Sequence, residues 1–147
     1  MKQIVIIGAG AAGCFAAINA ARRFKKNKYI IVEATQRPLT KVLISGGGRC
    51  NVTHNCFDPN ILVKNYPRGS KELIGAMHIF GPQDTCKWFA DEKITLVAEQ
   101  DGRMFPSTNS SKTISTCLLN LIEKENIYLQ KGKKVKTLKK IKNIFNL

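Results

Sequence analysis

The segment Ile4-Val5-Ile6-Ile7-Gly8-Ala9-Gly10-Ala11-Ala12-Gly13 decides the fold. Its apolar, β-branched start is typical of a parallel β-strand that is buried on both faces. The GxGxxG pattern follows, in which Gly8 permits a tight turn, Gly10 lets backbone approach a pyrophosphate, and Gly13 lets a helix pack closely on the strand. The segment therefore predicts the beginning of a dinucleotide-binding βαβ unit.

The residues that follow complete this unit. Residues 11–23 are rich in alanine and end in basic residues, which a helix C-terminus favours, and residues 29–32 form a second apolar strand. The free N–H groups at the start of the helix attract phosphate. Glu33, which ends the second strand, is placed to accept hydrogen bonds from both hydroxyls of an adenosine ribose. Because its carboxylate repels a 2′-phosphate, the site is expected to prefer FAD or NAD over NADP.

Length and hydropathy favour a single cytoplasmic domain. A chain of 147 residues is one domain by length and buries about two-thirds of its unfolded surface. Residues 4–18 lack charged side chains, so a signal peptide has to be considered. The run is only weakly apolar and is shorter than a membrane span, so the dinucleotide fingerprint explains it better. No membrane partner is expected.

The five cysteines contain no CxxC pair, which together with the lack of an export signal indicates reduced thiols. Cys50, His54 and Cys56 lie close enough in sequence to suggest a metal. Their spacing matches no zinc motif, and a fourth ligand would have to come from a distant part of the chain. No metal site is therefore predicted.

The chain is strongly basic, with a net charge of +14, and residues 131–147 contain seven lysines and no acidic residue. Such a segment attracts polyanions in general. Specific recognition of nucleic acid also needs a reading element, and the sequence contains no helix-turn-helix, RNP or zinc-finger pattern. A solvated, lysine-rich surface is the better interpretation, and no specific nucleic-acid partner is expected.

A second glycine-rich segment, residues 45–51 (Ser-Gly-Gly-Gly-Arg-Cys-Asn), follows the apolar residues 42–44. Three consecutive glycines do not stabilise a helix or strand, because glycine loses the most conformational entropy on ordering. They suit a backbone that passes close to a flat or phosphorylated group, and Arg49 offers a planar donor fork for phosphate or a ring carbonyl. A flexible surface loop fits the same residues equally well.

The remaining sequence predicts alternating helices and strands. Helices are expected over residues 71–80, 82–91 and 112–125, and strands over residues 94–97 and 127–129. A turn is expected at Asp101-Gly102. The helix over 112–125 and the strand after it form the next unit of a doubly wound sheet. The last apolar residues are spaced three or four apart, which favours a basic amphipathic helix: Val135, Leu138, Ile141 and Phe145.

The fingerprint, Glu33 and the string Lys41-Val-Leu-Ile-Ser-Gly-Gly-Gly-Arg-Cys-Asn-Val-Thr53 together resemble the BaiN/YhiN-type family of NAD(P)/FAD-dependent oxidoreductases. These are flavoproteins with a glutathione-reductase-like FAD domain and an inserted second domain. Phe80-Gly-Pro-Gln-Asp-Thr85 and Asp101-Gly-Arg-Met-Phe-Pro-Ser107 match two further landmarks of the family. The resemblance covers the chain from Met1 to about residue 142.

The resemblance implies an α/β fold, a Rossmann-like (FAD/NAD(P)-binding) doubly wound parallel sheet that is truncated where a β-meander starts. Residues 1–147 would be the N-terminal part of that domain: a βαβ unit (4–33), a flavin loop (41–54), a helical and loop excursion (60–111), a βα return (112–131) and an incomplete meander (133–147). The family's chains are more than twice as long. The missing C-terminal part of the same protein is therefore a candidate partner.

FAD is the cofactor that the resemblance implies, with NAD(P)H as electron donor. Backbone near Val135 would contact adenine, while Asn51 and Arg103 would lie towards the flavin. No motif assigns a catalytic residue, so the catalytic residues are unknown. The predicted cofactor-binding residues are Gly8, Gly10, Ala11, Ala12, Gly13, Glu33, Ala34, Lys41, Gly46, Gly47, Gly48, Arg49, Cys50, Asn51 and Val135.

The implied function is that of a flavoprotein oxidoreductase, which passes hydride from NAD(P)H through the flavin to an organic acceptor or to oxygen. Small molecules are the expected substrates, and the identity of the acceptor is open. Two alternatives remain at the level of sequence. One is a non-catalytic, truncated fragment with residual dinucleotide binding. The other is a basic polyanion-binding module that works through the lysine-rich tail.

Overall fold

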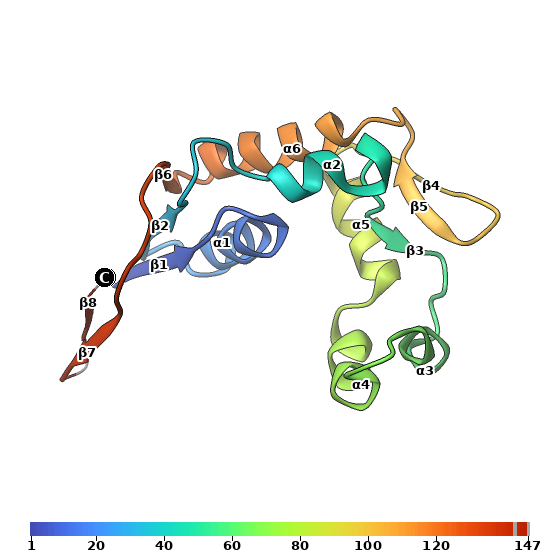
Figure 1. The fold of residues 1–147 in the computed structure, drawn as a ribbon, viewed down its shortest axis with the longest axis horizontal. Coiled ribbons are helices and arrows are strands. Elements are labelled where there is room, and N and C mark those ends of the chain that lie inside the picture. The colour runs from blue at the N-terminus through green and yellow to red at the C-terminus, as the bar shows by residue number, and fades with distance from the viewer. Residues whose placement is uncertain (143, 147) are drawn as a thin grey trace. The chain divides into compact units, whose positions relative to one another are not determined.

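The computed structural model describes residues 1–142 and 144–146, in two compact units. The first unit comprises residues 1–42 and 115–147, and the second comprises residues 43–114. Figure 1 labels the helices and strands of both units. In chain order they are β1 (Gln3–Ile7), α1 (Ala11–Arg23), β2 (Lys28–Val32), α2 (Thr40–Gly48), β3 (Thr53–His54), α3 (Pro59–Leu62), the 3₁₀ turn η1 (Val63–Asn65), α4 (Ser70–Ile79), α5 (Pro82–Asp91), β4 (Leu96–Ala98), β5 (Arg103–Pro106), α6 (Ser111–Lys124), β6 (Tyr128–Gln130), β7 (Lys139–Ile141) and β8 (Ile144–Asn146).

The first unit is built on a parallel sheet with the strand order β1-β2-β6. Val5 pairs with Ile30 and Ile31 pairs with Leu129, so the strand after α6 lies beside the strand that leads to Glu33. Parallel neighbours need a crossover helix, which α1 and α6 supply. The predicted α/β, Rossmann-like class is confirmed, and the predicted helix over residues 11–23 has the observed bounds of α1.

One face of this sheet carries the core of the unit. Tyr29 and Ile31 are buried, and the Tyr29 hydroxyl donates a hydrogen bond to the Ala20 carbonyl oxygen of α1 (2.8 Å). Residues on the other face, such as Val5 and Ile30, line a depression together with residues 133–137. The prediction that the first strand is buried on both faces is wrong, because β1 is at most half-buried and Ile7, at its end, is exposed.

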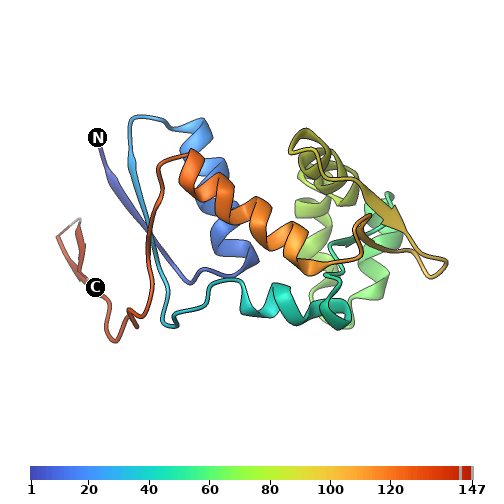
Figure 2. The same cartoon turned by 90° about the horizontal axis from the view of Figure 1, so that it is seen from above.

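The C-terminal part of α6 lies beside α1 in the same unit (Figure 2). Arg22 Nε donates to Glu125 Oε1 at 3.0 Å, which ties the ends of the two helices together. The apolar residues that the helical spacing assigned to the interior are buried as predicted: Ile114, Leu118, Leu121 and Ile122. Burial of one apolar stripe therefore holds α6 in place.

The second unit contains a small antiparallel sheet with the order β3-β5-β4 and three helices between its strands. The predicted turn at Asp101-Gly102 joins β4 to β5, although β4 begins two residues later than the predicted strand. Helix α5 starts at Pro82, and the Gly81 N–H donates to Asp84 Oδ2 at 2.8 Å, so a capping interaction fixes its first turn. Phe89 of α5 is buried in the core.

The lysine-rich tail differs from the helix that its residue spacing favoured. Instead of a basic amphipathic helix, residues 139–141 and 144–146 pair as the antiparallel strands β7 and β8, with Lys140 opposite Phe145. Its apolar side chains remain exposed, including Ile141 and Phe145, and so do its lysines. A short helix with closely spaced like charges has little stability in water. The spacing of the apolar residues was therefore not enough to make this segment helical. Residues 143 and 147 of the predicted segment lie outside the described residues.

In the described ranges, 1–142 and 144–146, the helices are all too short or too polar to cross a lipid bilayer.

Candidate cofactor-binding site

The first predicted site begins where β1 turns into α1. Gly8 has a φ of +98°, and its N–H donates to the Val32 carbonyl oxygen at 2.8 Å, so the chain leaves β1 while still bonded to β2. A Cβ on Gly13 would collide with the Gly8 carbonyl oxygen and press on Ile6. Only glycine lets α1 pack this closely against the strand.

The N-terminus of α1 is open to a ligand. Gly10 is the N-cap residue, no side chain caps the helix, and the first turn contains no acidic residue. Ala11 and Ala12 are exposed, and a Cβ on Gly10 would meet no atom within 4 Å. The positive end of the helix dipole and small side chains together suit a phosphate group. These are the predicted pyrophosphate-binding residues, and the structure brings them together at the carboxyl end of β1.

Glu33 lies beside this helix N-terminus, directly after β2. Its Oε2 accepts a hydrogen bond from the Ala9 N–H at 2.8 Å, and Oε1 accepts from the N–H of Thr35 at 2.8 Å and from its hydroxyl at 2.9 Å. These bonds, the one from the Thr35 N–H first, lower the pKa of Glu33 and keep it ionised. A carboxylate has about four acceptor positions, so a ribose with two hydroxyls has to displace at least one of the present donors.

The other predicted residues of the first unit lie around the sheet. Ala34 is exposed next to Glu33, and Lys41 is exposed on the first turn of α2. Val135 is half-buried and lines the depression on the sheet face that carries Val5 and Ile30. The segment before it stays bonded to the Glu33 strand, since Lys133 N–H donates to the Glu33 carbonyl oxygen at 2.8 Å. The structure therefore keeps the backbone that leads to Val135 beside Glu33.

The second predicted site, the glycine loop, belongs to the second unit. The helical geometry of α2 ends before Ser45, and Gly46, Gly47 and Gly48 have φ values of +56°, +67° and +85°. Cys50 is also left-handed, with a φ of +64°, and is buried. Its N–H donates to the Ser45 carbonyl oxygen at 2.9 Å, which closes the loop. The segment is an ordered turn, as expected where glycines serve a special backbone conformation.

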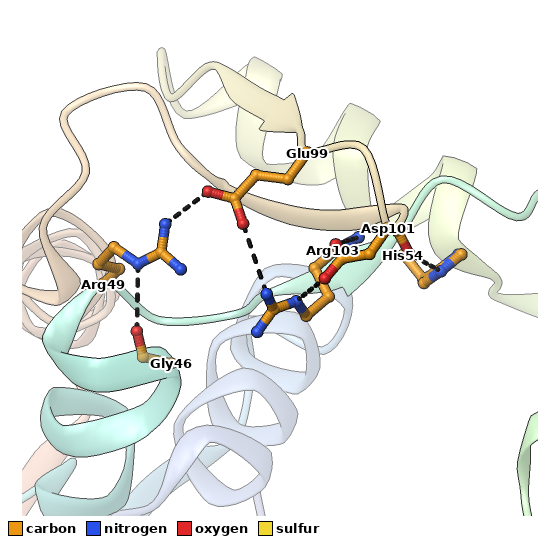
Figure 3. Close-up of polar contacts among 6 residues, drawn as sticks. All are labelled: Gly46, Arg49, His54, Glu99, Asp101 and Arg103. Carbon is orange, nitrogen blue, oxygen red and sulfur yellow. Dashed lines mark hydrogen bonds and ion pairs between the residues drawn. The ribbon is translucent and has the colours of Figure 1, made fainter.

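Arg49 does not extend freely from this loop, as Figure 3 shows. Its Nε donates to the Gly46 carbonyl oxygen at 3.3 Å, its Nη1 lies 2.5 Å from Glu99 Oε1, and its guanidinium stacks 4.0 Å from the centre of the Phe105 ring. Two of its donors and one of its faces are thus occupied inside the unit. The predicted role in binding phosphate or a ring carbonyl is left with the other N–H groups, the second one on Nη1 and the two on Nη2.

Glu99 and Phe105 are residues of this site that the sequence reasoning did not single out. Glu99 Oε2 lies 3.7 Å from Arg103, so its carboxylate bridges two arginines that are far apart in sequence from each other. The Asp101-Gly102 turn was the available signal, because it pairs β4 with β5 and so brings Glu99 towards Phe105. The spacing of residues 49 and 99 itself contains no such signal.

His54 is also held in place, on the side of Arg103 and Asp101 (Figure 3). Its Nδ1 accepts from the Cys56 N–H at 3.0 Å, so its Nε2 carries the ring proton and donates to the Asp101 carbonyl oxygen at 3.1 Å. Hydrogen bonding from the Arg103 N–H lowers the pKa of Asp101, whose side chain also bonds Arg103 Nε at 2.6 Å. Among the described residues, no group of three or more His, Cys, Asp or Glu side chains is placed to hold a metal ion.

The cysteines are thiols in this structure, and two of them are deeply buried. Burial raises the pKa of Cys14, on α1, to about 11, and the nearby charge of Glu33 adds to the effect. Burial likewise raises the pKa of Cys50 in the glycine loop. Both side chains are therefore neutral at pH 7 and pack as small apolar groups.

Comparison with known proteins agrees with this geometry. Residues 2–147 match the family model described as the HI0933-like protein Rossmann domain. The chain is 27% identical over 139 residues to the 3-dehydro-bile acid delta(4,6)-reductase of Clostridium scindens, a match that covers 95% of this chain and 33% of that protein. It is 34% identical over 70 residues to the ribosomal RNA dihydrouridine synthase of Escherichia coli, covering 48% of this chain and 17% of that protein. The matched segments therefore span a third or less of the length of these relatives.

Proposed function

The chain belongs to the HI0933-like family, and from that premise we propose that it binds FAD as part of a flavin-dependent oxidoreductase. The observation that carries the proposal is the open N-terminus of α1 next to the ionised Glu33, both at the carboxyl ends of neighbouring parallel strands. Ligands of open α/β sheets bind at such ends. The α1 N-terminus would hold the pyrophosphate, and Glu33 would hold the adenosine ribose.

The residues fit a dinucleotide on two independent grounds. Gly8 and Gly10 leave open space where side chains would stand, so backbone N–H groups can approach a bulky phosphate. Glu33 offers an acceptor that remains ionised at neutral pH and repels a 2′-phosphate, which favours FAD or NAD over NADP at this position. Val135 and Ala34 would then flank the adenine, since Ala34 follows Glu33 directly and the segment that leads to Val135 is bonded to Glu33 through the Lys133 N–H.

We propose that the glycine loop, Gly46–Asn51, takes the flavin end of the cofactor, together with Lys41, which precedes the loop in the sequence. When bound, FAD supplies two-electron chemistry, in which hydride from NADH or NADPH passes to an organic acceptor or to oxygen. The contribution of this chain would be an ordered loop whose backbone is held by Arg49 and whose thiol, Cys50, is neutral.

The acceptor is proposed to be an organic compound. One of the two relatives is named as a reductase of 3-dehydro-bile acids, and the other as a synthase of dihydrouridine in ribosomal RNA. Both names describe a reduced ring product. A small-molecule ring or a ring within a larger substrate is therefore the class of acceptor that we propose for this chain.

Titration of the 147-residue chain with FAD tests the proposal, read by the visible flavin spectrum and by flavin fluorescence. We expect binding with a structured, red-shifted flavin band, and bleaching on addition of NADH. Gly10→Ala should weaken FAD binding at least about tenfold, because its methyl group occupies the path of the pyrophosphate. Gly75→Ala on α4 is the matched control, since its Cβ also meets no atom within 4 Å.

The same titration decides between this proposal and simple nucleotide binding. If ADP binds as tightly as FAD and the flavin spectrum does not change, the chain would bind only the adenosine half and the flavin assignment would be wrong. If neither ligand binds to a folded chain, the whole proposal fails.

A further inference from the structure

The second unit contains a cavity that the proposed cofactor site does not use. It has a volume of about 380 Å³ and lies between the segment from Asn51 to His54 and the junction of α4 with α5. Tyr66, Met77 and Phe80 also line it. Its size falls within the usual range of small-molecule sites. Asn51 belongs both to this cavity and to the glycine loop, so the two features are adjacent within one unit.

The lining is polar but carries no net charge. All of the lining residues lie in the described part of the chain, and none of them is Asp, Glu, Lys or Arg. His54 is the one titratable imidazole among them, and both of its ring nitrogens are engaged, with the Cys56 N–H and the Asp101 carbonyl oxygen. A charged ligand would have no counter-ion here. The cavity therefore selects for an uncharged ligand.

Hydrogen-bonding groups remain available in the cavity. The Asn51 amide and the Tyr66 hydroxyl make no hydrogen bond to another residue of the described ranges, and both residues are exposed. An amide donates and accepts at once, as does a phenol. Such groups suit a carbonyl or an imide on the edge of a ring.

The cavity also contains a few apolar side chains. Phe80 is 40% exposed and Tyr66 is 39% exposed, so a ligand in the cavity can reach part of each residue. Met77 adds an adaptable apolar contact. Exposed aromatic rings at the border of a cavity are suited to stacking against a flat ring.

We propose that this cavity binds the ring of the organic acceptor, an uncharged cyclic carbonyl compound, with Phe80 and Tyr66 against its face and Asn51 at its polar edge. The chemical class of the ligand rests on the proposed function. The position of the binding site rests on the cavity alone. A uracil ring and a steroid ring ketone share this chemistry. The experiment has to separate these two sources.

Binding is measured on the ¹⁵N-labelled chain without FAD, by titration with uridine in one arm and with a water-soluble 3-oxo steroid in the other. Amide shifts should concentrate at Thr53, Thr85 and the start of α5. The single tryptophan, Trp88 on α5, gives a second readout through its fluorescence. The arm that saturates identifies the source of the ring, and failure of FAD binding leaves this result unaffected.

Two neighbouring residues give a matched pair of variants. Phe80→Ala should reduce the affinity for the bound probe about tenfold, the loss of roughly one stacked ring. Ile79→Ala should change it less than about twofold, because Ile79 is 84% exposed and does not line the cavity. Tyr66→Ala should reduce the affinity by a similar factor. It provides a second test of the cavity if Phe80→Ala fails to fold.

Two outcomes would overturn the proposal. The first is that neither probe shifts the cavity amides of the folded chain at millimolar concentration. The second is that Phe80→Ala and Ile79→Ala weaken binding equally, which would mean that the probe sits elsewhere.

Discussion

Arg49 and Glu99, fifty positions apart in sequence, form an ion pair of 2.5 Å. Because Glu99 lies in the connection between β4 and β5, this pair joins the glycine loop to those two strands. The same arginine bonds the carbonyl oxygen of Gly46 and stacks on Phe105. Because one side chain makes these contacts together, the loop conformation depends on residues that lie far from it in sequence.

Replacing Glu99 with Gln should loosen the loop rather than unfold the unit. The pair is partly exposed, so the free energy of unfolding should fall by only about 0.2–1 kcal/mol. Amide hydrogen exchange at Cys50, whose N–H bonds Ser45, should however become several-fold faster. Asp91→Asn breaks the more exposed Lys87–Asp91 pair on α5 and should leave the Cys50 amide unchanged. Equal exchange in wild type and Glu99→Gln would contradict the prediction.

Two glycines of the loop should respond differently to the same substitution. Gly46→Ala and Gly47→Ala both place an L residue at positive φ, which costs about 1–2 kcal/mol each. At Gly46 the new Cβ would also lie 2.8 Å from the Phe105 ring and 2.9 Å from the Asn51 nitrogen, whereas at Gly47 it meets no atom. Gly46→Ala should therefore destabilise the chain by about 1–3 kcal/mol more, measured by urea unfolding. A smaller loss for Gly46→Ala would show that the loop can shift at little cost.

Two glycines of the fingerprint, Gly10 and Gly13, should also differ in how much their substitution by alanine lowers the free energy of unfolding. Gly13→Ala forces α1 away from the Gly8 carbonyl oxygen, so we expect a loss of about 2 kcal/mol or more in the free energy of unfolding. Gly10→Ala has open space around the new methyl group, so it should cost no more than about 1 kcal/mol, which is the preference of an N-cap for glycine over alanine. Thermal and urea unfolding without ligand measure both. If Gly10→Ala destabilises as much as Gly13→Ala, steric contact does not explain the motif.

Stability should also depend on pH above 9 through Cys14. Burial raises its pKa from 9.0, the value of a solvated thiol, to about 11 in the folded chain, so the unfolded chain loses this proton first. The contribution is fully present below pH 9 and is lost as the pH rises to 11, at up to about 1.4 kcal/mol per pH unit. Cys14→Ala, which keeps a small apolar side chain, should flatten this part of the profile. Urea unfolding of both proteins from pH 8 to 11 is the measurement, and parallel profiles would contradict the assignment.

The βαβ unit could be predicted because its signals are local and agree with one another. The apolar strand, Gly8 to Gly13 and Glu33 each specify the same unit within about thirty residues. The exposure of Ile7 could not be read in this way, because it depends on what covers the second face of the sheet. A further parallel strand after the helix over residues 112–125 followed from the rule for parallel crossovers, and the structure pairs that strand, β6, with β2.

The second unit and the tail show where local patterns stop being informative. The glycines predicted a special backbone conformation, but Glu99 and Phe105 reach the loop only through the pairing of β5 with β3 and β4. In the tail, a spacing of three or four residues fits a helix, yet Ile141 and Ile144 instead face each other across a hairpin. Short segments carry too little periodicity to choose between these structures.

The left-handed run from Gly46 to Gly48 has a genetic consequence. Every glycine codon begins with two guanines, and each single-base missense change in it introduces a chiral L residue. At three adjacent codons the penalty therefore comes from handedness before any side-chain chemistry is considered. Every single-base missense mutation at these codons therefore strains the backbone of the loop. Selection against such mutations would act even if the loop bound no ligand.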